Sequence, residues 1–363
     1  MRKTLIVLAG LWSLFAVAAA HGQGTWSTAS LSQPREYLAA TSVGDCALFG
    51  GGDDANGWKS NTVDIFNAVT GQWSQAYLSQ ARGHLAATSI GSYALFGGGT
   101  YHVTAGWFAS SRVDIFNAGT GQWSTASLSQ EMSSLAATSV GNYALFGGGD
   151  LGSASFSSIL DIFNTSTGLW STASLSQGRN SVAATSVGNY ALFAGGLYSR
   201  GVWVTSNTVD IFNSSTGEWS TATLSRARRR IAATSVGDYA LFGGGDYGSG
   251  GSHLCGNTVD IFNSSTGEWS TATLSQARCG LAATSVGNYA LFGGGDYTAY
   301  VPCNTVDIFN AVTGQWSTAF LSQARDGLAA TSVGDYALFG GGWSAGFTHL
   351  RQCLFVTIAK SYS

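Results

Sequence analysis

The chain has 363 residues, of which 45% are hydrophobic, 12% aromatic and 10% charged, and its formal net charge is −3. This balance excludes an intrinsically disordered chain, which has few aromatic residues and a high net charge, and it argues against a nucleic-acid-binding protein, which carries a basic surface. The 50 glycines, 2 prolines and many short apolar runs favour short strands joined by tight turns.

The first predicted element is a secretory signal peptide over residues 1–20. Arg2 and Lys3 form its positive region, residues 5–17 its apolar region, and three alanines at 18–20 a small-residue cleavage site. A membrane anchor is the alternative, but the apolar stretch is short for a bilayer span. We therefore expect a secreted mature chain, residues 21–363, that forms a single domain without stable membrane insertion.

From residue 26 onward the chain repeats one unit. Each copy has, in chain order, a strand that opens with tryptophan (d), a strand such as "AATSV" (a), a strand such as "YALFG" (b) and a strand such as "TVDIFN" (c). Short Gly-containing turns join a to b and c to d, where Gly and Asn tolerate positive φ. The d-strand tryptophans are 47 to 50 residues apart: Trp26, Trp73, Trp123, Trp170, Trp219, Trp269 and Trp316. Antiparallel four-stranded units at this period are typical of β-propeller blades.

The repeat resembles that of kelch-repeat proteins. The resemblance rests on the Gly-Gly that ends strand b, the aromatic residue before it, the tryptophan that opens strand d and the arginine before strand a, and it covers about residues 24–342. It implies an all-β, kelch-type propeller. We interpret the tryptophans as packing residues of the blades rather than as ligand platforms.

Ring closure is expected from the strand order. The d strand at Trp26 precedes any a strand, while the last a–b pair, residues 328–342, lacks a d strand. Joining the two ends predicts a seven-bladed ring without exposed strand edges. The atypical tail "CLFVTIA", residues 353–359, must then supply the missing c strand.

The copies differ mainly in their d–a and b–c segments, which emerge on one face of a propeller and are here called the variable face. The a–b and c–d turns form the opposite, uniform face. Loop tolerance to change is the plain explanation, but aromatic and basic residues gather in the variable segments, which favours recognition. We expect ligand-binding residues there: Trp58, Trp107, Trp203, Trp343, Tyr101, Tyr198, Arg82, Arg179, Arg228, Arg229, Arg230 and Arg325.

Arginine recurs before strand a in all repeats but one, which has Met132. A ring of guanidinium groups could hold an anionic ligand bidentately. Alternatively, these arginines form structural ion pairs with the aspartates of the c strands. The additional Arg226, Arg229 and Arg230 lack matched aspartates and are the better ligand candidates.

In a secreted chain the five cysteines meet an oxidising environment. Cys255 and Cys303 stand just before neighbouring c strands, so we predict a disulfide between them, with Cys279 as a competing partner for either. Cys46 replaces the tyrosine of strand b and is expected to stay a buried free thiol. Three N-x-[ST] sequons, at Asn164, Asn213 and Asn263, are candidate glycosylation sites.

We expect binding rather than catalysis, by a monomer whose partner is an extracellular glycan or protein. The alternative is a secreted kelch-fold enzyme of the oxidase or sugar epimerase class, with its site on the same face. The histidines of the mature chain come from separated repeats and show no paired spacing of metal ligands. Neither a metal nor another cofactor is therefore expected.

Overall fold

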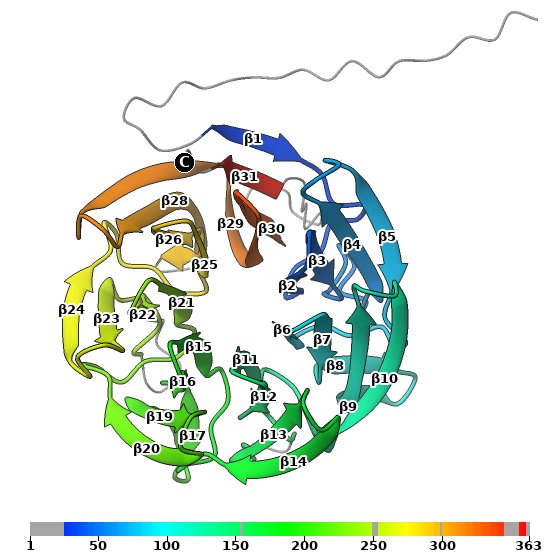
Figure 1. Ribbon diagram of the computed structural model, residues 1–363, viewed down its shortest axis with the longest axis horizontal. Coiled ribbons are helices and arrows are strands. Elements are labelled where there is room, and N and C mark those ends of the chain that lie inside the picture. Colours follow the sequence, from blue (N-terminus) through cyan, green and yellow to red (C-terminus); the bar gives the residue numbers. More distant parts are fainter. Residues whose placement is uncertain (1–24, 153–154, 249–252, 298–299, 345–355, 361–363) are drawn as a thin grey trace, which may run out of the picture.

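The computed structural model describes residues 25–152, 155–248, 253–297 and 300–344, together with the backbone of strand 356–360. Antiparallel sheets surround a central axis, with the a strands innermost and the d strands outermost (Figure 1). The fold is an all-β propeller of mostly four-stranded blades. No helix in the described part of the chain has the length and apolar character needed to cross a membrane. The expected signal peptide lies outside the described residues.

Four sheets have four strands each, and strands follow one another in the sheet in chain order. Their strands are β2 Ala39–Val43, β3 Cys46–Gly50, β4 Thr62–Asn67 and β5 Trp73–Tyr77; β11 Ala136–Val140, β12 Tyr143–Gly147, β13 Ile159–Asn164 and β14 Leu169–Ser174; β15 Ala183–Val187, β16 Tyr190–Ala194, β19 Thr208–Asn213 and β20 Glu218–Thr223; β21 Ala232–Val236, β22 Tyr239–Gly243, β23 Thr258–Asn263 and β24 Trp269–Thr273.

A fifth sheet has an additional strand from its b–c segment. It contains β6 Ala86–Ile90, β7 Tyr93–Gly97, β9 Gly106–Asn117 and β10 Gln122–Met132, and β8 Thr100–Val103 pairs with β9. The b–c segment of another repeat forms a separate hairpin, β17 Leu197–Ser199 with β18 Trp203–Thr205. The variable segments therefore build structure of their own above the blades.

The largest sheet contains both ends of the described chain (Figure 1). Its strands are β25 Ala282–Val286, β26 Tyr289–Gly293, β27 Asp296–Tyr297, β28 Val301–Asn310, β29 Trp316–Val333, β30 Tyr336–Trp343, β31 Val356–Lys360 and β1 Trp26–Ala29. Strand β31 lies between β30 and β1, with Trp26 opposite Ala359. The N-terminal d strand thus pairs with the C-terminal strand Val356–Lys360, while residues 353–355 of the expected c strand lie outside the described residues.

Six blades, rather than the expected seven, are present when continuous sheets are counted. The reason is β29, which pairs with β28 through its first residues, from Trp316, and with β30 through its last, up to Val333. One unbroken strand therefore joins two sets of four strands into one sheet.

The repeated "LFGGG" is required by packing between neighbouring blades. Phe96 is fully buried, and a Cβ atom on Gly50 of the preceding blade would lie 2.7 Å from the Phe96 ring. The same relation joins Gly340 to Phe49, from the last repeat to the first. Because real Cβ atoms cannot approach an aromatic ring so closely, glycine is favoured at this position; the strand Tyr190–Ala194 is the exception, with a buried alanine there.

The d-strand tryptophans pack as interpreted from the sequence. Trp73 lies with its ring centroid 5.2 Å from that of Phe66 and contacts the buried cluster that also holds Phe49. Each such cluster combines residues of two adjacent blades, so the core is a set of layers between blades rather than one central mass. Removing one blade would expose apolar surface on both of its neighbours.

The backbone also confirms the two faces. Asp53, at the start of a b–c segment, bridges to Glu36 of the d–a segment and to Lys59. On the other side, the Ala68 amide of a c–d turn donates to the Asp45 carbonyl of an a–b turn, at 2.8 Å. Variable segments therefore contact variable segments, and uniform turns contact uniform turns.

Candidate functional site

The arginines that precede the a strands are structural. Their side chains are buried and five of them pair with the aspartate of the c strand in the same repeat: Arg35–Asp64, Arg82–Asp114, Arg179–Asp210, Arg228–Asp260 and Arg278–Asp307. Arg325 is also buried and donates to the Gly341 carbonyl at 2.9 Å. The expectation that Arg82, Arg179, Arg228 and Arg325 bind a ligand is therefore corrected: with 0–1% of each residue exposed, no guanidinium surface is left for one.

The variable face instead surrounds a cavity of about 520 Å³ on the propeller axis, here called the axial cavity. Each repeat contributes the last residue of its d–a segment and the apolar residue that follows. The first of these two residues differs from repeat to repeat: Tyr37, His84, Ser134, Ser181, Arg230, Gly280 and Gly327. The second is always Leu, Val or Ile, as in Leu38 and Val182. The cavity thus has a constant apolar floor and a rim of individual side chains.

Every rim residue adopts the left-handed backbone conformation. The two glycines have φ of +66° and +65°, and the five other residues have φ between 51° and 53°. Backbone hydrogen bonds link neighbours around the rim, for example from the His84 amide to the Tyr37 carbonyl at 3.0 Å and from the Ser134 amide to the His84 carbonyl at 3.0 Å. Side chains at positive φ cost backbone strain and concentrate at functional sites.

One side of the rim is aromatic. The rings of Tyr37 and His84 stack with their centroids 4.2 Å apart and their planes 21° from parallel. Burial lowers the pKa of His84 from 6.5 to about 4, against the attraction of Asp53. The imidazole is therefore neutral at physiological pH, and the pair presents an uncharged flat surface.

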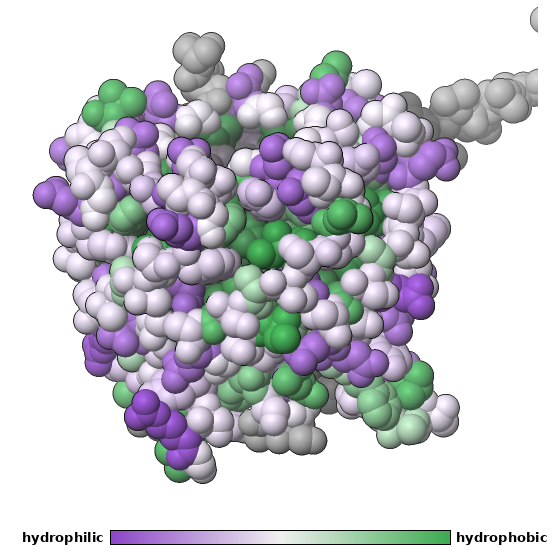
Figure 2. Space-filling view, turned by 60° about the horizontal axis from the view of Figure 1, so that its bottom comes forward, coloured by the Kyte–Doolittle hydropathy of each residue, from purple (hydrophilic) through white to green (hydrophobic). Residues whose placement is uncertain are grey.

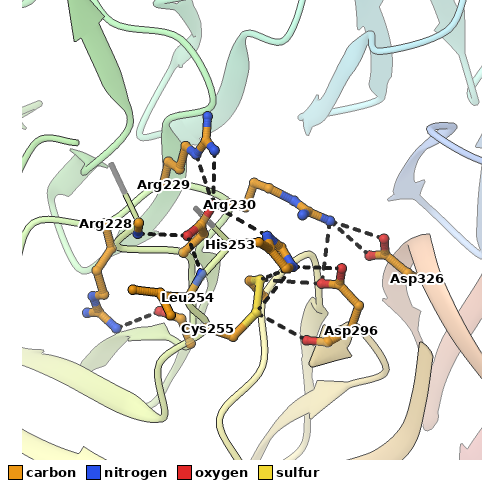
Figure 3. The surroundings of a disulfide bond; sticks show 12 residues. Arg228, Arg229, Arg230, His253, Leu254, Cys255, Asp296 and Asp326 are labelled. Atoms are coloured by element: carbon orange, nitrogen blue, oxygen red, sulfur yellow. Dashed lines mark hydrogen bonds and ion pairs between the residues drawn. A yellow bond between two sulfur atoms is a disulfide. The ribbon is translucent and has the colours of Figure 1, made fainter. Parts of the chain in front are cut away.

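The opposite side of the rim is charged. Arg230 pairs with Asp326 at 3.1 Å and lies 3.6 Å from Asp296 (Figure 3). Burial raises the pKa of Asp326 to about 6, although Arg230 opposes this shift. Burial would lower the pKa of Arg230, but Asp326 and Asp296 outweigh it and raise that pKa. A donor and an acceptor group thus lie together in the cavity wall.

The predicted loop aromatics do not form one site. Trp58 and Trp107 are about half exposed, at 55% and 53%, and both contact His102, with ring centroids 4.8 and 4.6 Å apart. Lys59 lies over the Trp107 ring at 4.5 Å. Tyr198 lies beside Arg200 at 5.3 Å and Tyr101 beside Phe108 at 6.0 Å. Trp203 is exposed, and Trp343 lies opposite Asp326 at the end of β30. In the view of Figure 2, apolar residues form small groups between hydrophilic ones.

The predictions for the cysteines have different outcomes. The disulfide joins Cys255 to Cys279, so the predicted Cys255–Cys303 bridge is wrong and the competing partner is the real one. Cys303 is buried and free, whereas Cys46 is free but only half-buried. Burial raises the pKa of the Cys46 thiol.

Asn164, Asn213 and Asn263 each end a c strand on the uniform face, and their Oδ1 atoms accept backbone amides two residues on, at 2.9, 3.0 and 2.9 Å. Their glycosylation stays a prediction.

The rim was only partly found from the sequence. Arg230 was a predicted ligand residue, whereas Tyr37, His84, Ser134, Ser181 and Asp326 were not. A usable signal was present: the last letters of the d–a segments read Y, H, S, S, R, G and G. Such variety at one fixed place in a strict repeat indicates a position that packing does not determine. Arg229, the other predicted ligand residue beside Arg230, pairs with Asp246 at 3.0 Å and keeps 27% of its side chain exposed.

Comparisons with known proteins support only the architecture of the chain. No family model matches the chain, and no curated protein matches it. Among solved structures it is similar to one titled "Structure of YjhT", with a TM-score of 0.62 and 16% identity over 80% of this chain and 99% of that chain. At this identity the likeness shows the β-propeller fold.

Proposed function

We propose that the protein is an exported, kelch-type recognition propeller that binds a glycan in the axial cavity. The observation that carries the proposal is the rim. Five of its seven residues keep side chains at a positive φ, where glycine would be unstrained. These side chains surround a cavity of about 520 Å³, within the range of small-molecule sites.

The chemistry of the rim suits a polyhydroxylated ring. The neutral stack of Tyr37 and His84 offers a flat face to the apolar side of a sugar. Ser134 and Ser181 add hydroxyl groups, and Arg230 with Asp326 supplies a charged donor beside a charged acceptor. A purely anionic ligand fits less well, because Arg230 already has two carboxylates near it.

The proposal includes a closed ring of seven four-stranded blades. The first part of β29 completes the set β25, β26 and β28, and its last part begins the set β30, β31 and β1. Divided in this way, each set has the a, b, c and d strands of the other blades, and each blade contributes one rim residue. Closure supports the proposed function because it fixes the rim geometry.

The test is a glycan array probed with the labelled mature chain, residues 21–363, followed by calorimetric titration of the strongest ligand. We expect Tyr37→Ala and Arg230→Gln each to weaken binding by about 10-fold or more, the equivalent of 1.4 kcal/mol. The uniform-face variants Glu218→Gln and Asp238→Asn serve as controls and should bind as the parent does.

A different result would relocate or remove the site. If Trp58→Ala with Trp107→Ala abolished binding while Tyr37→Ala did not, the ligand would bind the exposed loops instead of the axial cavity. If no glycan bound but a secreted protein were retained on the immobilised chain, and Trp58→Ala with Trp107→Ala released it, the partner would be a protein.

A second candidate function has one specific observation in its favour. Asp326 has a pKa of about 6 because of burial, which suits a group that exchanges protons with a bound substrate near neutral pH. We therefore also propose a test for turnover of any sugar that the array identifies. Asp326→Asn should abolish such turnover while binding persists; equal turnover by the variant would leave the recognition function alone.

A further inference from the structure

Four potential metal ligands converge where two neighbouring blades meet on the variable face. His253 and Cys255 come from the b–c segment between β22 and β23. Cys279 comes from the d–a segment after β24, and Asp296 is the first residue of β27. Their ligand atoms all lie within 4.8 Å of one another. Cys279 and Asp296 have no exposed surface, and Cys255 is 8% exposed. The cluster is thus enclosed.

The internal repeats show that this cluster is exceptional. Asp53, Asp150, Asp246 and Asp296 occupy the same place, directly after the triple glycine. Asp53 is neutralised by Lys59 at 2.7 Å, and Asp246 by Arg229 at 3.0 Å. At Asp296, the position equivalent to Arg229 is Cys279. At Asp150 the equivalent residue is Ser133, so among these aspartates Asp296 is the one that faces a sulfur atom at this position.

The distances that involve His253 and Asp296 are close to those of tetrahedral zinc coordination, whereas the two sulfurs are bonded to each other in this form and must separate to bind zinc. Zinc bonds of about 2.3 Å to sulfur and about 2.0–2.1 Å to nitrogen or oxygen, at tetrahedral angles, separate sulfur from nitrogen or oxygen by about 3.5 Å and nitrogen from oxygen by about 3.4 Å. The His253 Nε2 atom lies 3.6 Å from Cys255 Sγ and 3.4 Å from Cys279 Sγ. Asp296 lies 3.3 Å from Cys279 Sγ through Oδ1 and 3.0 Å from His253 Nε2 through Oδ2.

An outer layer of residues orients these groups (Figure 3). The second ring nitrogen of His253, Nδ1, lies 3.6 Å from Asp246 Oδ2, so a carboxylate stands near the ring nitrogen that zinc would not use, as around other zinc-binding histidines. Tyr300 stacks on the imidazole with centroids 4.2 Å apart. Arg230 lies 3.6 Å from Asp296 Oδ1. Two thiolates, one carboxylate and Zn²⁺ sum to a charge of −1, and the Arg230 guanidinium, which also pairs with Asp326, lies beside them.

We propose that this cluster is a redox-controlled zinc site, in which the Cys255–Cys279 disulfide and a bound Zn²⁺ ion are exclusive alternatives. In the oxidised form the two sulfurs bond to each other. A thiol reductant supplies two electrons and two protons, which convert the disulfide to two thiols while the reductant leaves as its own disulfide. Zinc then displaces the two thiol protons and takes Cys255, Cys279, His253 and Asp296 as ligands. Either form cross-links the two blades.

The experiment uses the mature chain, reduced with a phosphine, freed of reductant under nitrogen and equilibrated with zinc. We expect the reduced protein to retain one zinc per chain by elemental analysis, and the oxidised protein to retain none. Affinity, measured by competition with a chromophoric chelator, should fall at least 10-fold in Cys279→Ser and in Asp296→Asn. Asp246→Asn should lower it by about 10-fold or more as an outer-layer change. Cys303→Ser is the matched cysteine control and should bind zinc as the parent does.

Thermal unfolding distinguishes loss of zinc binding from loss of the fold in the variants. Zinc should raise the melting temperature of the reduced parent, because a ligand that binds only the folded state stabilises it. It should not do so in the double variant Cys255→Ser with Cys279→Ser, whose circular dichroism spectrum reports on the fold. Zinc retention by the double variant equal to that of the reduced parent, or no zinc-dependent stabilisation of the parent, would overturn the proposal.

Discussion

Tyr37 stacks on His84 across the boundary between two repeats, with the ring centroids 4.2 Å apart, and the Tyr37 carbonyl accepts the His84 amide at 3.0 Å. The two residues are 47 positions apart in the sequence and occupy the same place in successive repeats. One contact therefore links the backbone of the rim to the surface that it presents to the cavity. The low pKa of His84 follows from this enclosed position.

The first prediction concerns pH. The unfolded chain takes up the His84 proton near pH 6.5, but the folded protein does so only near pH 4. The stability contribution of neutral His84 is therefore fully present above pH 6.5 and is lost as the pH falls through about 4. In urea unfolding measured across this pH range, acid should lower the free energy of unfolding of His84→Asn by less than that of the parent, the difference being at most about 3 kcal/mol. Ser181→Asn, at an equivalent rim position, should keep the full loss; identical curves for the parent and His84→Asn would contradict the shift.

The second prediction separates stability from recognition at the rim. Ser134 and Ser181 have φ of 52° and 51°, whereas the equivalent Gly280 and Gly327 are unstrained. Replacing either serine with glycine should raise the free energy of unfolding by up to about 1 kcal/mol, because left-handed strain is relieved, while weakening any ligand that the hydroxyl contacts. The reverse change, Gly327→Ala, should destabilise the protein. A loss of stability in both serine variants would show that the hydroxyls have a structural role.

The third prediction uses the repeat in which methionine replaces arginine. Asp161 faces Met132 there; its Oδ2 atom is buried and makes no hydrogen bond within the described part of the chain, and burial raises its pKa. Because the folded pKa is raised, ionisation of Asp161 costs stability as the pH rises through that pKa. Asp161→Asn keeps the acceptor for the Ser129 amide, at 2.8 Å, and should stabilise the protein by about 1–2 kcal/mol at neutral pH.

Asp260 is the matched comparison, since it pairs with the buried Arg228. Asp260→Asn should destabilise by about 3–5 kcal/mol, because a buried guanidinium is left without its counter-charge. Chemical denaturation of both variants measures the difference. Effects of the same sign would refute this account of the arginine–aspartate pairs.

The fourth prediction concerns closure. Trp26, on β1, packs against the buried cluster that contains Phe339 and Leu328. Trp26→Ala should lower the free energy of unfolding by about 1–3 kcal/mol, less than for a fully buried tryptophan because Trp26 is only half-buried. Leu169→Ala, at an outer position that is 68% exposed, should change it little. An unchanged melting temperature for Trp26→Ala would mean that β1 does not contribute to ring stability.

The β-propeller fold could be predicted from the sequence, because each blade packs against a neighbour of the same kind. Gly50 and Phe96 are two sides of one contact, and a contact that recurs between most of the blades appears as a repeat in the sequence. The orphan d strand at Trp26 likewise predicted its pairing at the other end of the chain. Such local requirements can be read from composition, spacing and turn residues alone.

Which variable residues lie together could not be predicted from the sequence and is seen in the folded chain. Arg228 and Arg230 are two positions apart, but Arg228 points into a blade and pairs with Asp260, while Arg230 points to the axis and pairs with Asp326. Cys255 forms its disulfide with Cys279 and not with Cys303, because the d–a segment of one repeat lies against the b–c segment of the repeat before it. These contacts join residues of different strands and repeats and depend on how neighbouring blades pack together, which no single segment encodes.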